Sequence, residues 1–223
     1  MIIFENVHKS YRTRLGRRII VDQLDMVLDT RKNIGILGLN GAGKSTLLRL
    51  ISGAELPDRG RIRRTVSISF PLGYVGCFAS NMSGRENAAF LARVYGFDVD
   101  QVVSFVEVFA ELGDYFDEPV KTYSSGMSAR LGFGTSIALE FDVYLIDEGF
   151  SAGDARFAAR CQTAFKERLE NSRVIIVSHA TETLLTYCDV GATLHEGKLT
   201  YYDDIKEAVA CYNEIVNEPV DVQ

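Results

Sequence analysis

The chain has 223 residues and a mass of 24.8 kDa, enough for one domain with an additional subdomain. Hydrophobic residues make up 47% and charged residues 24%, with only 4 prolines, which excludes a disordered, collagenous or low-complexity chain. No apolar run reaches the roughly 18 residues that a membrane span needs. The first residues also have the charge order opposite to that of a secretory signal. We therefore expect a soluble protein that at most docks on a membrane.

The net charge of −6 is unevenly distributed along the chain. Residues 203–223 carry a net charge of −5, so the rest of the chain is close to neutral. No broad basic surface is expected that could displace counterions from a nucleic acid, and we predict no nucleic-acid partner. One basic cluster stands out, formed by Arg12, Arg14, Arg17 and Arg18. It could lie near phosphates or anionic lipid, but a solvated hairpin tip is the favoured interpretation.

The four cysteines are far apart in the sequence, at positions 77, 161, 188 and 211. They form no Cys-x-x-Cys pair and have no histidine at the spacing of metal ligands. This pattern argues against a disulfide framework and against a zinc site. It predicts buried free thiols in a reducing cytoplasm.

The N-terminal third alternates strands with one helix. Residues 1–7 and 19–29 mix β-branched and polar residues as half-exposed antiparallel strands do, and the arginine-rich segment around Gly16 is expected to connect them. Residues 33–38 form a short apolar strand that ends in glycines. Apolar residues at helical spacing then predict a helix over 44–53, and residues 57–62 are expected to form a turn.

The middle of the chain changes to helical patterns, over residues 83–95, 101–112 and 125–140. Ser83 and Glu86 have the spacing of a capping box at the start of the first of these helices. Two continuous apolar strands follow, at 143–147 and 173–179, separated by a helix at about 153–170. This order predicts a βαβ unit of a parallel sheet that is buried on both faces. The last predicted elements are a hairpin over 192–202 and an amphipathic helix over 203–217.

A glycine-rich motif follows the strand at 33–38. Residues 38–45, Gly-Leu-Asn-Gly-Ala-Gly-Lys-Ser, match the phosphate-binding pattern G-x-x-x-x-G-K-[ST] in full. Backbone N–H groups can converge on a phosphate only where the turn tolerates unusual dihedral angles and leaves no Cβ in the way. The helix N-terminus adds its positive end, Lys44 supplies a mobile charge for the outer phosphates, and Ser45 offers a hydroxyl to Mg²⁺. The nucleotide-binding residues expected here are Gly38, Asn40, Gly41, Ala42, Gly43, Lys44, Ser45 and Thr46.

Two acidic residues end the strand at 143–147. Asp147 emerges at its carboxyl end, where ligands bind in open α/β sheets, and can hold the Mg²⁺ shell. Glu148 comes next and can orient and deprotonate a water molecule, as a catalytic base does.

Together with the phosphate loop, these residues resemble the ATP-binding cassette family over almost the whole chain. Residues 123–127, Tyr-Ser-Ser-Gly-Met, lie where the family has its Leu-Ser-Gly-Gly-Gln signature, 21 residues before Asp147. Residues 151–154 resemble the D-loop of the family, and His179 resembles its switch histidine. Tyr11 lies where the family stacks an aromatic ring on adenine.

The resemblance implies a fold, cofactors and an assembly. The fold class expected is α/β: a P-loop NTPase core with a mostly parallel sheet, an N-terminal antiparallel β-subdomain and an inserted α-helical subdomain. The core would span about 1–76 and 139–205, the helical subdomain about 77–138, and the C-terminal helix with its acidic tail about 203–223. ATP and Mg²⁺ would bind between two copies of the chain. Ser124, Ser125, Gly126 and Asp154 would contact nucleotide, while Lys44, Glu148 and His179 would serve catalysis.

The sequence departs from the family at two places. The signature has Ser125 where glycine is usual and Met127 where glutamine is usual, but Ser124 and Gly126 keep the hydroxyl and the key small residue. A working signature is therefore expected. The family also has a glutamine in the stretch that corresponds to 67–73, and none is present here. Either another group or water would complete the Mg²⁺ shell, or the coupling to the partner differs.

Together with residues 71–73, Pro-Leu-Gly, and 83–87, Ser-Gly-Arg-Glu-Asn, these departures resemble the ATP-binding subunits of bacterial polysaccharide exporters, and the capsule-export members most closely. The resemblance implies a motor of capsular or related polysaccharide export, on the cytoplasmic face of the inner membrane. Two integral membrane permease subunits would handle the polysaccharide and contact the chain around Phe70–Asn87, with Phe70, Phe78 and Met82 partly exposed. Arg85 and Glu86 could instead only cap and decorate a helix. The alternative function is a stand-alone ATPase of the same family, in translation or DNA repair.

Overall fold

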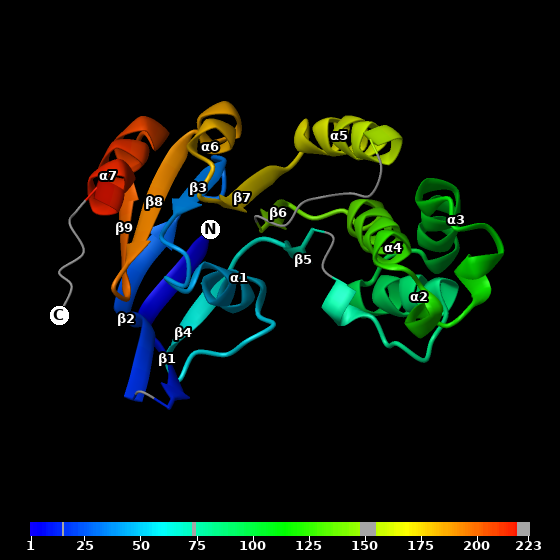
Figure 1. The fold of residues 1–223 in the computed structure, drawn as a ribbon, viewed down its shortest axis with the longest axis horizontal. Helices are drawn as coiled ribbons and strands as arrows, with labels where there is room; N and C mark the ends of the chain where they lie inside the picture. Colours follow the sequence, from blue (N-terminus) through cyan, green and yellow to red (C-terminus); the bar gives the residue numbers. More distant parts are fainter. Residues whose placement is uncertain (15, 73–74, 148–154, 218–223) are drawn as a thin grey trace. The chain divides into compact units, whose positions relative to one another are not determined.

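The computed structural model describes residues 1–14, 16–72, 75–147 and 155–217 (Figure 1). The chain divides into two compact units, and each is described by itself. The first contains Met1–Ser69, Asp142–Glu148 and Arg173–Gln223, and the second contains Phe70–Phe141 and Gly149–Ser172. Among the described residues, the strands form one sheet in the order β2-β1-β4 and another in the order β5-β6-β7-β3-β8-β9.

The first sheet is antiparallel and consists of β1 (Ile2–Thr13), β2 (Gly16–Leu28) and β4 (Arg59–Arg64). The two long strands were predicted, but they extend through the arginine-rich segment, so that Arg12 lies opposite Arg17. The turn expected over 57–62 is wrong from Arg59 onward, where the residues belong to β4. The sequence did not predict this edge strand because its arginines leave no alternation of apolar and polar residues. Glu5 of β1 stabilises the strand by accepting hydrogen bonds from Arg61 and Arg63.

The second sheet holds the parallel strands that the sequence predicted. Its members are β3 (Ile34–Leu37), β5 (Ile68–Pro71), β6 (Val143–Ile146), β7 (Arg173–Val177), β8 (Val190–His195) and β9 (Lys198–Tyr202). Strands β6, β7, β3 and β8 pair in parallel, and β9 returns antiparallel to β8 in the predicted closing hairpin. The carboxyl ends of β6, β7 and β3 therefore meet at one edge of the sheet.

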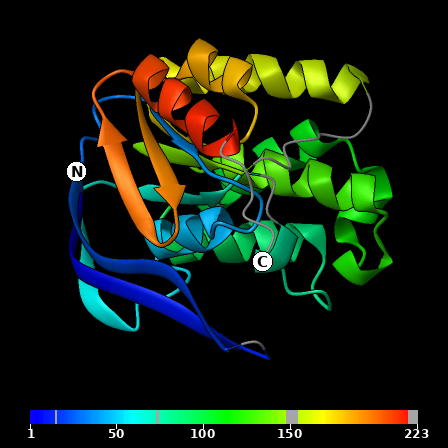
Figure 2. The same cartoon turned by 60° about the vertical axis from the view of Figure 1, so that its left-hand side comes forward.

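Strand β3 is buried on both faces because two layers cover the sheet. Ile34 and Ile36 belong to one hydrophobic core with α1 (Lys44–Ser52) and the antiparallel sheet. Gly35 faces the other way, toward α6 (Thr181–Tyr187) and α7 (Ile205–Asn217). Helices α1 and α7 thus cover opposite faces of the sheet (Figure 2). Helix α6 was not predicted, since it has only 7 residues and a single buried one, Leu184.

The second unit contains the predicted helices. They are α2 (Gly84–Tyr95), α3 (Val99–Ala110), α4 (Ser125–Ala138) and α5 (Ala155–Leu169), joined by the short 3₁₀ helices η1 (Val75–Cys77), η2 (Gly113–Asp117) and η3 (Val120–Thr122). The capping box is confirmed: Ser83 accepts from the Glu86 backbone N–H, and the Glu86 carboxylate accepts from that of Ser83. None of the helices in the described residues is long and apolar enough to cross a membrane.

Helix α5 groups with the other helices rather than with the sheet. The ring of Phe109 on α3 lies 5.7 Å from that of Phe133 on α4 and 5.7 Å from that of Phe157 on α5. Arg160 of α5 also donates to Glu111, at 2.7 Å. The sequence-based boundaries had assigned this helix to the core, because chain order alone cannot say which aromatic cluster a helix joins.

The cysteines are free thiols. Cys161 and Cys188 are buried, whereas Cys77 and Cys211 are partly buried. Burial raises the pKa of the Cys161 and Cys188 thiols to about 12 and that of Cys77 to about 11, so these three stay protonated at neutral pH. The thiolate is the reactive form, so burial lowers the reactivity of these three thiols.

The packing of α7 on β8 leads to a first prediction, at Gly191. A Cβ added there would overlap the Cβ of Ala208 and approach Ile205 Cδ1 to 3.0 Å. We expect Gly191→Ala to lower the free energy of unfolding by about 1–3 kcal/mol, as overpacking of a dense core does. Urea denaturation followed by circular dichroism measures this loss.

The matched control for Gly191→Ala is the double variant with Ala208→Gly. Removing the Ala208 methyl group restores room for the new Cβ, so the double variant should be more stable than the sum of the two single effects predicts. Strictly additive losses would contradict the contact between β8 and α7 as the cause.

Candidate nucleotide-binding site

The phosphate loop connects β3 to α1 and needs its glycines for different reasons. Gly41 and Gly43 have φ angles of +81° and +110°, in the left-handed region that other residues rarely adopt. A Cβ on Gly43 would also lie only 2.5 Å from Ile20 Cγ2, since β2 packs directly under the loop. The loop therefore closes tightly at the N-terminus of α1, where unpaired backbone N–H groups favour an anion.

Lys44 is the first residue of α1, and its ammonium group is held inside the loop. It is only 7% exposed, and Nζ donates to the carbonyl oxygens of Gly38 at 2.8 Å and Leu39 at 3.3 Å. Gly38 itself is buried under the loop. These carbonyl groups keep a positive charge next to the position that a phosphate would occupy.

A pocket of about 460 Å³ opens in front of the loop. It is lined by Tyr11, Thr13, Arg18, Ile20, Asn40, Gly41, Gly43, Lys44, Ser45, Thr46 and Asp147. The pocket thus brings together an aromatic ring from β1, the phosphate loop and the acidic residue after β6. Of the other loop residues expected to bind nucleotide, Gly38 lies beneath it and Ala42 lines a neighbouring depression with His195.

Ser45 and Asp147 line the same pocket and suit a magnesium ion. Mg²⁺ in nucleotide sites is usually bound by one or two protein oxygens and completed by phosphates and water. The described residues contain no group of three or more His, Cys, Asp or Glu side chains that could hold a metal by itself. A hydroxyl and a single carboxylate therefore fit an ion that arrives with a phosphate ligand.

His179 follows β7 at the same edge of the sheet as Asp147. Strand β7 lies between β6 and β3, so His179 comes from the strand between those that carry Asp147 and the phosphate loop. Its side chain is exposed and is not among the residues that line the pocket. Glu148 and the stretch 151–154, with Asp154, lie outside the described residues.

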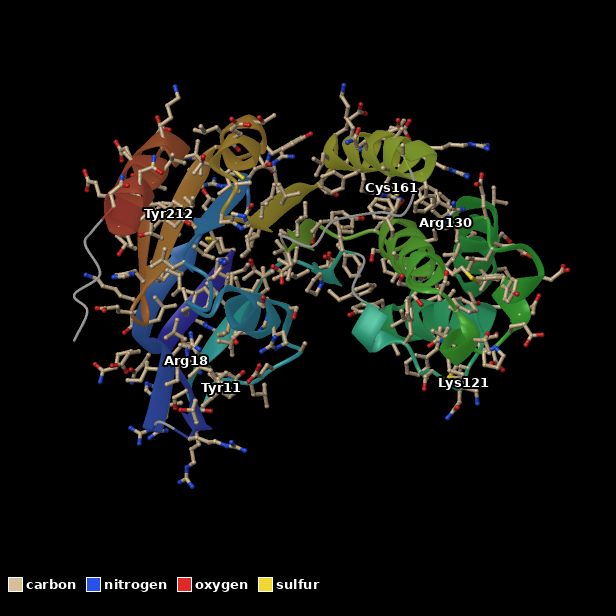
Figure 3. All side chains as sticks on the ribbon, in the orientation of Figure 1. Tyr11, Arg18, Lys121, Arg130, Cys161 and Tyr212 are labelled. Atoms are coloured by element: carbon tan, nitrogen blue, oxygen red, sulfur yellow. The ribbon has the colours of Figure 1, made fainter. Side chains whose placement is uncertain are left out.

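Arg18 lines the pocket, although the sequence favoured a solvated hairpin tip over a place near phosphates for its cluster. It is the register partner of Tyr11 across β1 and β2, so both side chains lie on the same face of the sheet (Figure 3). Its guanidinium donates to the carbonyl oxygen of Gly41. Arg18 is exposed, and its place beside the phosphate loop fits the alternative interpretation, a position near phosphates, better than the favoured hairpin tip. The alternation along β2 could have indicated this, because Ile20 and Arg18 are two residues apart and share a face.

The signature residues begin α4 in the second unit. Ser124 is the N-cap of the helix, and its hydroxyl accepts a hydrogen bond from the Met127 N–H at 3.2 Å. Ser124 and Ser125 are exposed. A Cβ on Gly126 would meet only Ser124 Oγ, at 3.9 Å, so nothing in the described chain requires a glycine there. An exposed helix start with a small residue is the kind of surface that another molecule can approach closely.

The segment predicted to contact a membrane partner differs from expectation at Phe70. This residue is only 6% exposed, and its ring lies 6.1 Å from that of Tyr95 and 6.4 Å from that of Phe141. The prediction of partial exposure is therefore wrong for Phe70, because an aromatic cluster covers it. Phe78 and Met82 are partly exposed, as predicted.

Asn87 holds the rest of this segment in place. It is 1% exposed, and its amide donates to the carbonyl groups of Ala79, Met82 and Ser83 at 3.1, 3.3 and 2.9 Å. Its carbonyl oxygen accepts from the Ala79 N–H at 2.8 Å. The hydrogen bonds of the buried Asn87 side chain thus hold the backbone around Phe78 and Met82 in place.

Arg85 and Glu86 agree with the structural interpretation of the sequence. Glu86 closes the capping box, and Arg85 donates to Asp117 and Glu107, at 2.7 Å in each case. The Arg85 guanidinium also lies 4.8 Å from the centre of the Phe116 ring. These ion pairs raise the pKa of Arg85 and join α2 to α3 and η2.

The geometry around Lys44 gives a second prediction. We expect Lys44→Ala to weaken ATP binding by about 10- to 100-fold, because a charged hydrogen-bond donor to phosphate is worth about 1.5–3 kcal/mol. Isothermal titration calorimetry measures the affinity. Lys32→Ala is the control: this exposed lysine precedes β3, whereas Lys44 follows it. Equal losses in both variants would contradict a specific role for Lys44.

Comparison with known proteins agrees with this geometry. Residues 21–151 match the sequence profile of the family described as "ABC transporter". The chain is 46% identical to the capsule polysaccharide export ATP-binding protein CtrD of Neisseria meningitidis serogroup B, over 96% of this chain and 100% of that protein. It is 47% identical to the polysialic acid transport ATP-binding protein KpsT of Escherichia coli, over 96% of this chain and 99% of that protein.

Solved structures of similar fold are ATP-binding cassettes. One, described as the ATP-binding subunit of an ABC transporter, has a TM-score of 0.72 at 19% identity and covers 96% of this chain and 99% of its own. Another, the dimeric ATP-binding cassette MJ0796 bound to ADP and Pi, has a TM-score of 0.70 at 17% identity and covers 90% and 98%. These likenesses confirm the α/β P-loop fold. With a family profile matched over more than half of its length and relatives this similar over almost all of it, the chain belongs to the ABC transporter family, as a nucleotide-binding ATPase domain.

Proposed function

We propose that this chain is the ATP-hydrolysing subunit of an exporter of capsular or related cell-surface polysaccharide. The observation that carries the proposal is the pocket that joins Tyr11, the phosphate loop and Asp147. The identity of 46–47% to proteins named for the export of capsule polysaccharide and the transport of polysialic acid supports the substrate class. No specific observation favours the alternative, a stand-alone ATPase without a membrane partner.

In this proposal the pocket holds ATP from base to phosphates. Tyr11 stacks on the adenine, and the loop residues from Gly38 to Thr46 bind the phosphates through their N–H groups and through Lys44. Ser45 and Asp147 hold Mg²⁺, which supplies positive charge against the phosphates when bound. The glutamine that the family has in the stretch 67–73 is missing here, so another group or water would complete the Mg²⁺ shell.

The chemical step uses groups at the carboxyl edge of the sheet. Water attacks the γ-phosphorus while Glu148 takes a proton from it, the bond from the γ-phosphorus to the bridging oxygen breaks and releases ADP, and His179 stabilises the γ-phosphate. Both follow strands that are neighbours of one another, β6 and β7. The nucleotide is completed by Ser124, Ser125, Gly126 and Asp154 of a second copy of the chain. The open space beside Gly126 supports this, because it leaves room for a phosphate group of the second copy's nucleotide.

In the proposed assembly, two copies of the chain share each nucleotide site. Two copies close on two ATP molecules and pull on two integral membrane permease subunits, and hydrolysis resets them, as a population shift driven by differential nucleotide binding. The permeases contact the chain around Phe70–Asn87 and handle the polysaccharide. The chain thus works at the cytoplasmic face of the bacterial inner membrane, attached through its permease and not to nucleic acid.

The test of the catalytic proposal is Glu148→Gln. We expect ATP turnover to fall at least about 100-fold, because a general base of this kind contributes about that factor or more. An ATP-dependent dimer should accumulate, since ATP still binds but is not cleaved. Phosphate release and size-exclusion chromatography with ATP measure both effects. Glu140→Gln, at an exposed side chain paired with Arg168, is the control. Normal turnover in Glu148→Gln would exclude Glu148 as the base.

The permease contact is tested by charge substitution at Phe78. We expect Phe78→Asp to reduce co-purification of the permease by about tenfold or more, because a partly exposed aromatic ring is a typical anchor of an interface. ATP binding by the isolated chain should stay unchanged. Val108→Asp, on the exposed face of α3, is the control and should leave co-purification intact. If both variants retain the permease equally, the contact lies elsewhere.

A further inference from the structure

The hydroxyl group of Tyr11 is bound within the protein rather than left to solvent. It donates to the carboxylate of Glu55, which follows α1. Glu55 is not among the residues that line the pocket, and its side chain is 20% exposed. The Tyr11 ring, which the proposed function places against the base, is therefore held through its hydroxyl group by Glu55, a residue outside the pocket lining.

Glu55 collects two cations in addition to this hydroxyl. Lys9 Nζ lies 2.8 Å from one carboxylate oxygen, and Arg49 Nε donates to the other at 3.0 Å. Lys9 is 8% exposed and also donates to the carbonyl of Leu56 at 2.9 Å. These hydrogen bonds outweigh burial and lower the pKa of Glu55 to about 2, so the carboxylate stays charged at neutral pH.

Arg49 extends the network to the phosphate loop. Its guanidinium donates to the Tyr11 hydroxyl oxygen at 3.3 Å and to the Thr46 hydroxyl at 3.1 Å. Thr46 and Arg49 both belong to α1, the helix that begins at the phosphate loop, and Thr46 lines the pocket. The chain of contacts thus runs from the aromatic ring through Glu55 and Arg49 to the first turn of that helix.

The Tyr11 ring has a further contact besides those of its hydroxyl group. Tyr11 lies on β1 and α1 belongs to another layer, so no regular secondary structure fixes the distance between them. Lys9 Nζ lies 5.4 Å from the centre of the Tyr11 ring, within the range of a cation–π contact. A ring held at its hydroxyl and against a cation has fewer rotamers to lose when a base stacks on it.

We propose that Glu55 is a positioning residue for base recognition, which fixes the Tyr11 ring at a set distance and orientation from the phosphate loop. The inference rests on the proposed function, because it requires Tyr11 to contact the base. If Glu55 only stabilised the fold, its loss would lower the affinity for all ligands of the pocket to the same extent. A positioning role instead affects ligands that carry a base and spares those that carry only phosphates.

The experiment compares two ligands of the purified full chain, ATP and inorganic tripolyphosphate, by isothermal titration calorimetry. In Glu55→Gln we expect ATP affinity to fall about 3- to 10-fold, the range for losing one ordered side chain. Tripolyphosphate affinity should change by less than about twofold, because the loop is intact. Equal losses for both ligands, or no loss for ATP, would overturn the proposal.

A further variant, Tyr11→Phe, keeps the test decisive if Glu55→Gln folds poorly. Tyr11→Phe removes the same hydrogen bond, keeps the ring and leaves Lys9 and Arg49 paired with Glu55. It should lower ATP affinity to a similar extent, and the double variant with Glu55→Gln should be no worse than either. Additive losses would contradict action through Tyr11. Glu5→Gln is the control, because the Glu5 carboxylate is likewise paired with two cations, Arg61 and Arg63 of β4, and does not line the pocket.

Tyr11→Ala separates this inference from the proposed function. If it leaves ATP affinity unchanged, Tyr11 has no base contact, and both the adenine role and the positioning role fail. If it weakens ATP but Glu55→Gln and Tyr11→Phe do not, the adenine role stands and only the positioning role fails.

Discussion

The site depends on the way strand β3 leaves the sheet. The strand is buried on both faces, so the chain must turn at its end and begin α1 within a few residues. Gly41 and Gly43 make that turn with positive φ angles, and Ile20 lies so close beneath Gly43 that no side chain fits. The same constraint that packs β2 under the loop directs the N–H groups at the start of α1 toward the pocket. Anion binding is a consequence of this closure.

Sheet order converts that local turn into a site. Because β6, β7 and β3 are parallel neighbours, the residues that follow them come from a single edge, and Asp147 lines the pocket together with Ser45. The antiparallel sheet contributes the remaining wall from a different layer: Tyr11 and Arg18 are register partners and face the loop. An aromatic ring, two cations and a carboxylate thereby surround a volume of about 460 Å³.

The second unit is stabilised by different interactions. Its interior is an aromatic cluster around Phe109, and its polar surface is ordered by paired charges such as those of Arg85 and Arg160. Against this dense packing, the start of α4 stands out, because Ser124 is exposed and Gly126 has open space beside it. In the segment Phe70–Asn87, which is predicted to contact the permease, Asn87 holds the backbone in place, and Phe78 and Met82 are partly exposed.

The sequence by itself determined the fold class, the phosphate loop, the parallel strands, most helices and the family, since these depend on local spacing and on motifs within one segment. The roles of the individual site residues stay predictions, and Glu148 and Asp154 also lie outside the described residues. Tertiary structure alone decided that Arg18 lines the pocket, that Phe70 is covered, that arginines form an edge strand, and that Glu55 holds Tyr11. Each depends on a partner distant in sequence. Arg18 contacts Gly41, and Phe70 packs near Phe141. The arginines of β4 pair with Glu5, and Glu55 binds Tyr11 on β1. Periodicity reports which face of an element is apolar, but the identity of the residue across from it is set only when layers and registers meet.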